Sequence, residues 1–177
     1  VEPGSGVTLA VLTLLALLLL AECCGRIVVA RIALPIFESS PPFQVPAYPA
    51  CPDALGLKIP VCTVGSSSDL PQTNATLAAA LFMPTSGQAR GLVVFCPEFG
   101  ADRWSSDGYC AGLRERGFAI LAFDFRSQGD SCAVHPDYRP SHWVTRFELE
   151  DVLSAVRWSQ TDSRFQHLPL YLMGVSR

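Results

Sequence analysis

The sequence is poor in charge: only 16% of its 177 residues are Asp, Glu, Lys or Arg, and the formal net charge is −3. Its basic residues form no stripe that a nucleic-acid backbone would meet. The segment 96–108 has neither Gly-x-Gly-x-x-Gly nor the Lys-Ser/Thr end of a phosphate-binding loop. The seven cysteines fit no zinc spacing. We therefore expect no nucleic acid, no metal ion and no organic cofactor.

Hydrophobic residues, in contrast, make up 49% of the chain, which is enough to build the core of one ordinary domain. The stretch Val7 to Ala21 carries no charge and consists almost wholly of Leu, Val, Ala and Thr. It is shorter than the roughly 20 residues that span a bilayer, but a tilted helix can use part of the sequence that follows. We predict a hydrophobic membrane-anchor segment in residues 1–34.

A secretory signal peptide is the alternative, and it gives a secreted or periplasmic protein. Against it, the chain begins with Val-Glu and lacks a charged leading region, so we expect its natural start to be missing. The sequence "LAEC" resembles a lipoprotein cleavage site, but Glu22 stands where a small residue is expected. Arg26 and Arg31 favour the cytoplasm for the flank they occupy, and the side of the membrane stays open because the other flank offers no comparison.

Seven prolines lie between residues 35 and 60, and this density favours an extended spacer over a helix. We predict a linker over 35–56 and an α/β domain over 57–177. Cys51 and Cys62 lie in loop-like sequence and can form a disulfide if the domain is exported. The other cysteines of the domain are expected to be free buried thiols: Cys96, Cys110 and Cys132.

Apolar runs and helical patterns alternate along the predicted domain. Strands over 57–64 and 76–83, joined by a turn-rich segment, form an antiparallel beginning. After them, strands alternate with helices, which indicates a parallel sheet with helices on its faces. The expected elements are buried strands at 91–96, 118–125 and 168–173 and a helix over 106–116.

A second helix is predicted from a capping box, the Thr-x-x-Glu pattern of Thr145 and Glu148. The apolar residues that follow recur at the spacing of one helical face: Leu149, Val152, Leu153 and Val156.

The last strand runs into Gly174-Val175-Ser176. This is the first half of a Gly-x-Ser-x-Gly nucleophile elbow, in which the serine sits on a sharp turn from strand to helix. Two other loops follow the preceding strands, "CPEFGADRW" and "DFRSQGDS".

With these motifs, residues 57–177 resemble the N-terminal portion of the α/β-hydrolase superfamily, in its esterase-like and serine-aminopeptidase-like branch. The resemblance implies a mostly parallel sheet with flanking helices, cut off at the elbow. The matching residues are Asp124, Arg126, Gly129 and Ser131 of an Asp-x-Arg-x-x-Gly-x-Ser loop, and Gly174 and Ser176 of the elbow.

By this resemblance, Ser176 is the nucleophile that attacks an ester, thioester or amide carbonyl of a small-molecule, acyl or peptide substrate. The backbone N–H groups of Phe99 and Arg177 would hold the oxyanion. The chain departs from the family at Pro97 and Glu98, where His-Gly is usual. Proline cannot donate a hydrogen bond, and a carboxylate would repel an oxyanion unless it points away or is paired.

Arg103 and Arg126 are possible partners for Glu98, whereas Asp124 and Arg126 are expected to form a structural pair that shapes their loop. The family order of Ser, acid and His places the acid and the base after Ser176, and all three histidines precede it. We therefore expect an incomplete fragment, inactive as given, with one sheet edge uncovered and residues 92–96 partly exposed. The competing hypothesis is a non-catalytic, membrane-anchored α/β domain that binds a ligand through its strand-end loops.

Overall fold

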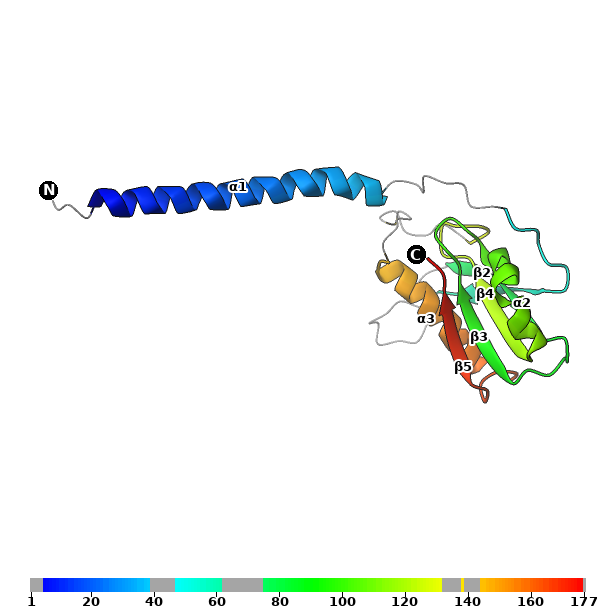
Figure 1. The fold of residues 1–177 in the computed structure, drawn as a ribbon. Coiled ribbons are helices and arrows are strands. Elements are labelled where there is room, and N and C mark those ends of the chain that lie inside the picture. The colour runs from blue at the N-terminus through cyan, green and yellow to red at the C-terminus, as the bar shows by residue number, and fades with distance from the viewer. Residues whose placement is uncertain (1–4, 39–46, 62–74, 132–137, 139–143, 177) are drawn as a thin grey trace. The chain divides into compact units, whose positions relative to one another are not determined.

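The computed structural model describes residues 5–38, 47–61, 75–131, 138 and 144–176. The chain divides into two compact units, Val1–Ser39 and Ser40–Arg177 (Figure 1).

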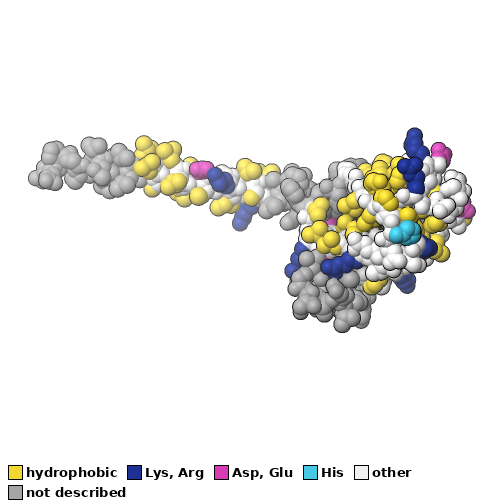
Figure 2. All heavy atoms as spheres, turned by 90° about the horizontal axis from the view of Figure 1, so that it is seen from below, with side chains coloured by type: hydrophobic (Ala, Val, Ile, Leu, Met, Phe, Trp, Pro, Cys, Tyr) yellow, Lys and Arg dark blue, Asp and Glu magenta, His cyan; other side chains and the backbone are white. Residues whose placement is uncertain are grey.

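The first unit contains one long helix, α1 (Ser5–Glu38). Its stretch Thr13–Ile32 is long and apolar enough to cross a membrane, a test that a signal sequence also passes. Figure 2 shows the described side chains of α1 as a mainly hydrophobic surface interrupted by charged groups, among them the Glu22–Arg26 ion pair at 2.6 Å. The helix includes Pro35, which the sequence pattern placed in the linker. Pro35 lies close to the helix end, where few intrahelical hydrogen bonds depend on it.

The second unit is built on a five-stranded mixed sheet in the order β1-β2-β4-β3-β5. The first three strands in that order pair antiparallel, and β4, β3 and β5 pair parallel. The predicted antiparallel beginning and parallel continuation are therefore confirmed. The strands are β1 (Leu55–Pro60), β2 (Thr76–Phe82), β3 (Gly91–Cys96), β4 (Phe118–Phe123) and β5 (Leu170–Gly174).

Two helices cover opposite faces of the sheet, α2 (Ser106–Glu115) and α3 (Arg146–Thr161) (Figure 1). Side chains of β3 alternate between the faces, as a pleated strand requires. Val93 and Phe95 pack in the cluster that contains Cys110 of α2, whereas Leu92 and Val94 pack with Ala155 of α3. Each face thus has its own apolar core.

The expected exposure of the strands is wrong at two places. Residues 92–96 were expected to be partly exposed, yet β3 is buried throughout because β4 and β5 flank it and helices cover both faces. The third strand was expected to be buried, yet β5 is the edge strand, and Tyr171 and Leu172 are 50% and 61% exposed. A continuous apolar run does not distinguish a central strand from an edge strand.

The predicted capping box of α3 is confirmed. The Phe147 N–H donates to the Thr145 hydroxyl at 3.2 Å, and the Glu148 carboxylate accepts from the Thr145 N–H at 2.8 Å. The apolar residues of the helical pattern are only partly buried: Leu149 is 50% exposed, and Val152, Leu153 and Val156 are half-buried. The buried positions of this helix are mostly polar: Glu148, Glu150, Asp151, Ser154, Ala155 and Ser159.

Loss of the cap should weaken the domain measurably. Replacing Thr145 with alanine removes an acceptor for a helix N–H, so we expect the free energy of unfolding to fall by about 1 kcal/mol. Thr161→Ala is the control, since that exposed hydroxyl only bonds the Trp158 carbonyl at the other end of the helix. Its effect should stay within about 0.5 kcal/mol. Urea denaturation of both variants measures the difference, and equal effects would contradict the cap's role.

Candidate active site

Ser176 lies two residues beyond the end of β5 and is exposed. Its φ of +24° is unusual for a residue with a side chain. The turn is held by the Val175 N–H, which donates to the Cys96 carbonyl at the end of β3 at 3.2 Å. A strained backbone at a serine that follows a strand is the conformation that a nucleophile elbow needs.

The loop after β3 meets Ser176. The Phe99 N–H donates to the Ser176 carbonyl at 3.2 Å, and Gly100, with φ of +84°, turns the chain next to it. The structure therefore brings two of the predicted site residues together, with the Phe99 amide bonded to the serine's own backbone. The other predicted oxyanion donor, Arg177, lies outside the described residues.

Glu98 has different partners from those expected. Its carboxylate accepts hydrogen bonds from the Ser105 hydroxyl at 3.1 Å and from the Tyr48 hydroxyl at 3.4 Å. Neither Arg103 nor Arg126 is used, because each of these arginines is paired with other carboxylates. The sequence offered no signal for Tyr48, which lies 50 positions away.

The expected pairing of Asp124 with Arg126 is also wrong. Asp124 is buried after β4 and forms an ion pair with Arg103, whose side chain also binds Asp130 at 2.6 Å. The Arg103 N–H and the Asp130 N–H donate to the Asp124 carboxylate at 2.6 and 2.8 Å. Burial raises the pKa of Asp124, and these donors oppose the rise. Asp124 thus ties the two loops beside Ser176 together.

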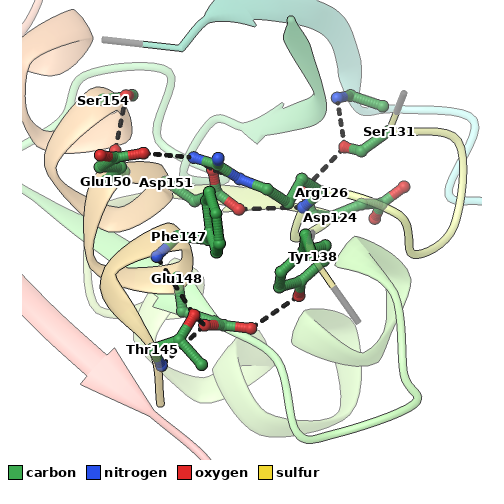
Figure 3. A network of polar contacts seen from close by, with 11 residues as sticks. Asp124, Arg126, Ser131, Tyr138, Thr145, Phe147, Glu148, Glu150, Asp151 and Ser154 are labelled. Carbon is green, nitrogen blue, oxygen red and sulfur yellow. Dashed lines mark hydrogen bonds and ion pairs between the residues drawn. The ribbon is translucent and has the colours of Figure 1, made fainter. Parts of the chain in front are cut away.

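Arg126 is paired with α3 (Figure 3). Its guanidinium contacts Asp151 at 2.6 Å and Glu150 at 3.2 Å, and all three side chains are buried. Its backbone N–H also donates to Asp151 at 2.9 Å. Burial raises the pKa of Asp151 to about 6, although Arg126 stabilises the ionised form. The sequence pattern assigned no role to Glu150 or Asp151, because nothing in the local pattern shows which charged residues of a helix are buried.

The remaining residues of the Asp-x-Arg-x-x-Gly-x-Ser loop shape its backbone. The Ser131 hydroxyl donates to the Asp124 carbonyl at 2.7 Å and accepts from the Ala78 N–H of β2 at 2.8 Å. Gly129 has φ of +49°, and a Cβ there would overlap the Asp124 carboxylate. The motif therefore fixes the loop through packing and hydrogen bonds.

Gly129→Ala should be much more harmful than the same change at Gly87. Both have positive φ, which costs alanine about 1–2 kcal/mol, but a Cβ at Gly87 meets nothing within 4 Å. At Gly129 the buried Asp124 carboxylate must also move away from Arg103, so we expect a loss of about 3 kcal/mol or more. Thermal and urea unfolding of the two variants test this; equal losses would show that backbone strain alone explains the glycine.

Among the described residues, the one histidine lies at the opposite end of β5 from Ser176. His167 is exposed and precedes β5, whereas Ser176 follows that strand. His135 and His142 lie outside the described residues.

Within the described parts of the chain, no group of three His, Cys, Asp or Glu residues could hold a metal ion. Cys96 and Cys110 are buried and form no disulfide, as expected, and burial raises the pKa of Cys110 to about 11. Cys51 is a free, half-buried thiol, and both Cys62 and Cys132 lie outside the described residues.

Ser176 borders an apolar hollow of about 540 Å³ between α3 and β5. Val144, Leu149 and Val152 form one wall, and Leu172 and Val175 form the other. Leu149 of α3, which is exposed, therefore lines this hollow.

Comparison with known proteins finds no matching family model and no matching curated sequence. Solved structures do match. The esterase Pf2001 from Pyrococcus furiosus has a TM-score of 0.54 and 18% identity, covering 78% of this chain and 47% of its own. The α/β-hydrolase GrgF from Penicillium sp. sh18 has a TM-score of 0.51 and 19% identity, covering 69% and 37%.

The chain thus spans less than half the length of either structure. At such low sequence identity, the similarity to these structures is evidence for the fold alone. The second unit of this chain has the fold of the α/β-hydrolase superfamily.

Proposed function

We propose that the protein is a serine hydrolase that cleaves an ester, thioester or amide through an acyl-enzyme at Ser176. The observation that carries the proposal is the backbone of Ser176, a positive φ at an exposed serine directly after a parallel strand. Such strain persists only where the surrounding structure holds it, and it concentrates at functional sites. The names of the matching structures, an esterase and an α/β-hydrolase, agree with this reaction class.

In this mechanism the Ser176 Oγ attacks the carbonyl carbon of the substrate, and the carbonyl oxygen becomes an oxyanion. The Phe99 N–H is already directed at Ser176 and would exchange its present acceptor, the Ser176 carbonyl, for that oxyanion. The amide of Arg177 is the proposed second donor. A base must take the hydroxyl proton, and we propose that a histidine and an acid outside the described residues supply it.

The apolar hollow beside Ser176 suits an apolar group of the substrate. The apolar helix α1 supports a role as a membrane anchor, with residues 35–56 as the connection to the domain over 57–177. We propose a small-molecule, acyl or peptide substrate and attachment to a membrane through α1.

The test is covalent labelling. The protein expressed from its complete gene should react with a fluorophosphonate probe, and peptide mass mapping should find the adduct on Ser176. Heat-denatured protein is the control and should not react. Absence of any adduct on the folded protein would favour the competing function, a non-catalytic α/β domain that binds a ligand at the same loops.

A further inference from the structure

Glu98 lies in the loop that carries Phe99, and its side chain connects this loop to two other segments. Its carboxylate binds the Ser105 hydroxyl, and Ser105 is fully buried at the N-terminus of α2. A serine at this position commonly caps its helix, but Ser105 makes no such bond and gives its hydroxyl to Glu98. The second oxygen of Glu98 accepts from Tyr48, at 3.4 Å.

The backbone of Glu98 is held as well. The Ala101 N–H donates to the Glu98 carbonyl at 3.1 Å, which closes a turn at Gly100. The peptide that joins Glu98 to Phe99 carries the N–H that reaches the Ser176 carbonyl. The direction of this N–H is therefore set by a residue whose side chain and backbone are both fixed.

We propose that Glu98 is a positioning residue that aims the Phe99 N–H at Ser176 by fastening the loop to Ser105 and Tyr48. The inference rests on the proposed function for its catalytic consequence, but the loop geometry is testable without it. The proposal also explains why a carboxylate lies beside a site where negative charge would develop. Each oxygen accepts a hydrogen bond from a hydroxyl group of another segment, and these donors partly offset the carboxylate charge.

The tyrosine is a dependable donor. Partial burial, and next the neighbouring Glu98 carboxylate, raise the pKa of Tyr48, so its phenol keeps its proton at neutral pH. A carboxylate is the side chain that can accept from two hydroxyl groups at once. Glutamine retains one carbonyl acceptor of the same length, whereas alanine retains none.

Four variants test the proposal: Glu98→Ala, Glu98→Gln, Ser105→Ala and, as control, Glu115→Ala. Glu115 is exposed at the end of α2 and carries the same charge. The first measurement is amide hydrogen exchange in the complete protein. Glu98→Ala and Ser105→Ala should raise exchange at Phe99 and Ala101 by about tenfold or more, and Glu98→Gln by much less, since local opening sets this rate. Glu115→Ala should leave it unchanged.

The second measurement is steady-state hydrolysis, or the rate of fluorophosphonate labelling, by the same variants. Glu98→Ala should lower kcat about 10- to 100-fold with little change in KM, part of what loss of an oxyanion donor costs. Glu98→Gln should recover most of that loss. Unchanged exchange at Phe99 in Glu98→Ala would overturn the proposal. So would a rise spread evenly over β3 and α2, because it would mean general destabilisation.

The experiments can contradict the proposed hydrolase function and the positioning role of Glu98 independently of each other. If the wild-type protein takes up no probe, the proposed hydrolase function fails, and hydrogen exchange still decides whether Glu98 holds the loop. If the probe reacts equally with wild type and Glu98→Ala, the hydrolase stands and the positioning role is wrong.

Discussion

Replacing Arg126 with methionine should lower the free energy of unfolding by about 3–5 kcal/mol at pH 7.5, because it leaves buried carboxylates without their cation. Asp151 is fully buried and Glu150 nearly so, and the Arg126 guanidinium is the cation that contacts both. Urea denaturation measures the loss. The matched control is Arg164→Met, whose ion pair with Asp162 is 42% exposed on the arginine side and should contribute under about 1 kcal/mol.

The same variant should show a characteristic pH dependence. The pKa of Asp151 is raised by burial to about 6, above its ordinary value near 4. Because this pKa is raised, the contribution of the Asp151 carboxyl group to stability is complete below its unfolded-state pKa. That contribution is lost as the pH rises through the folded-state pKa. Without Arg126 the ionised carboxylates are less favourable still, so the difference between wild type and variant should grow between pH 5 and pH 8. A difference that shrinks over this range would show that the pair is not buried as described.

Replacing Ser176 with alanine should lower the rate of hydrolysis by about 10⁴-fold or more in the complete protein, as expected when a nucleophile is removed. Binding of substrate should change little, because the apolar walls of the hollow remain. Ser163→Ala is the control, since Ser163 is an exposed serine after α3. A residual rate within tenfold of wild type would identify another nucleophile. Initial rates with short-chain and long-chain p-nitrophenyl esters also test whether the hollow prefers an apolar acyl group.

Features that depend on neighbours along the chain were predictable. The β-branched run of β3 and the capping box of Thr145 are local patterns, and the structure places both as expected. The order of antiparallel and parallel strands followed from the same alternation. The resemblance to the α/β-hydrolase superfamily placed Phe99 close to Ser176, and the structure brings the two residues together after neighbouring parallel strands.

Features that depend on distant partners were not predictable. Arg126 pairs with a carboxylate 25 positions away and Glu98 with a tyrosine 50 positions away. Because Arg126 is buried, the charged residues of α3 that pair with it face the core, and Leu149 lines the hollow. Helical periodicity locates the apolar residues of α3, but it does not show that polar residues of the same helix are buried against Arg126. The exposure of β5 likewise depends on its place at the sheet edge.

The most direct test of the central claim is a crystal structure of the complete protein after reaction with a fluorophosphonate. We predict phosphorus bonded to the Ser176 Oγ and a phosphonyl oxygen about 3 Å from the Phe99 nitrogen, which has then left the Ser176 carbonyl. A phosphonate on any other side chain, or a Phe99 amide that still binds the Ser176 carbonyl beside the adduct, would contradict the account.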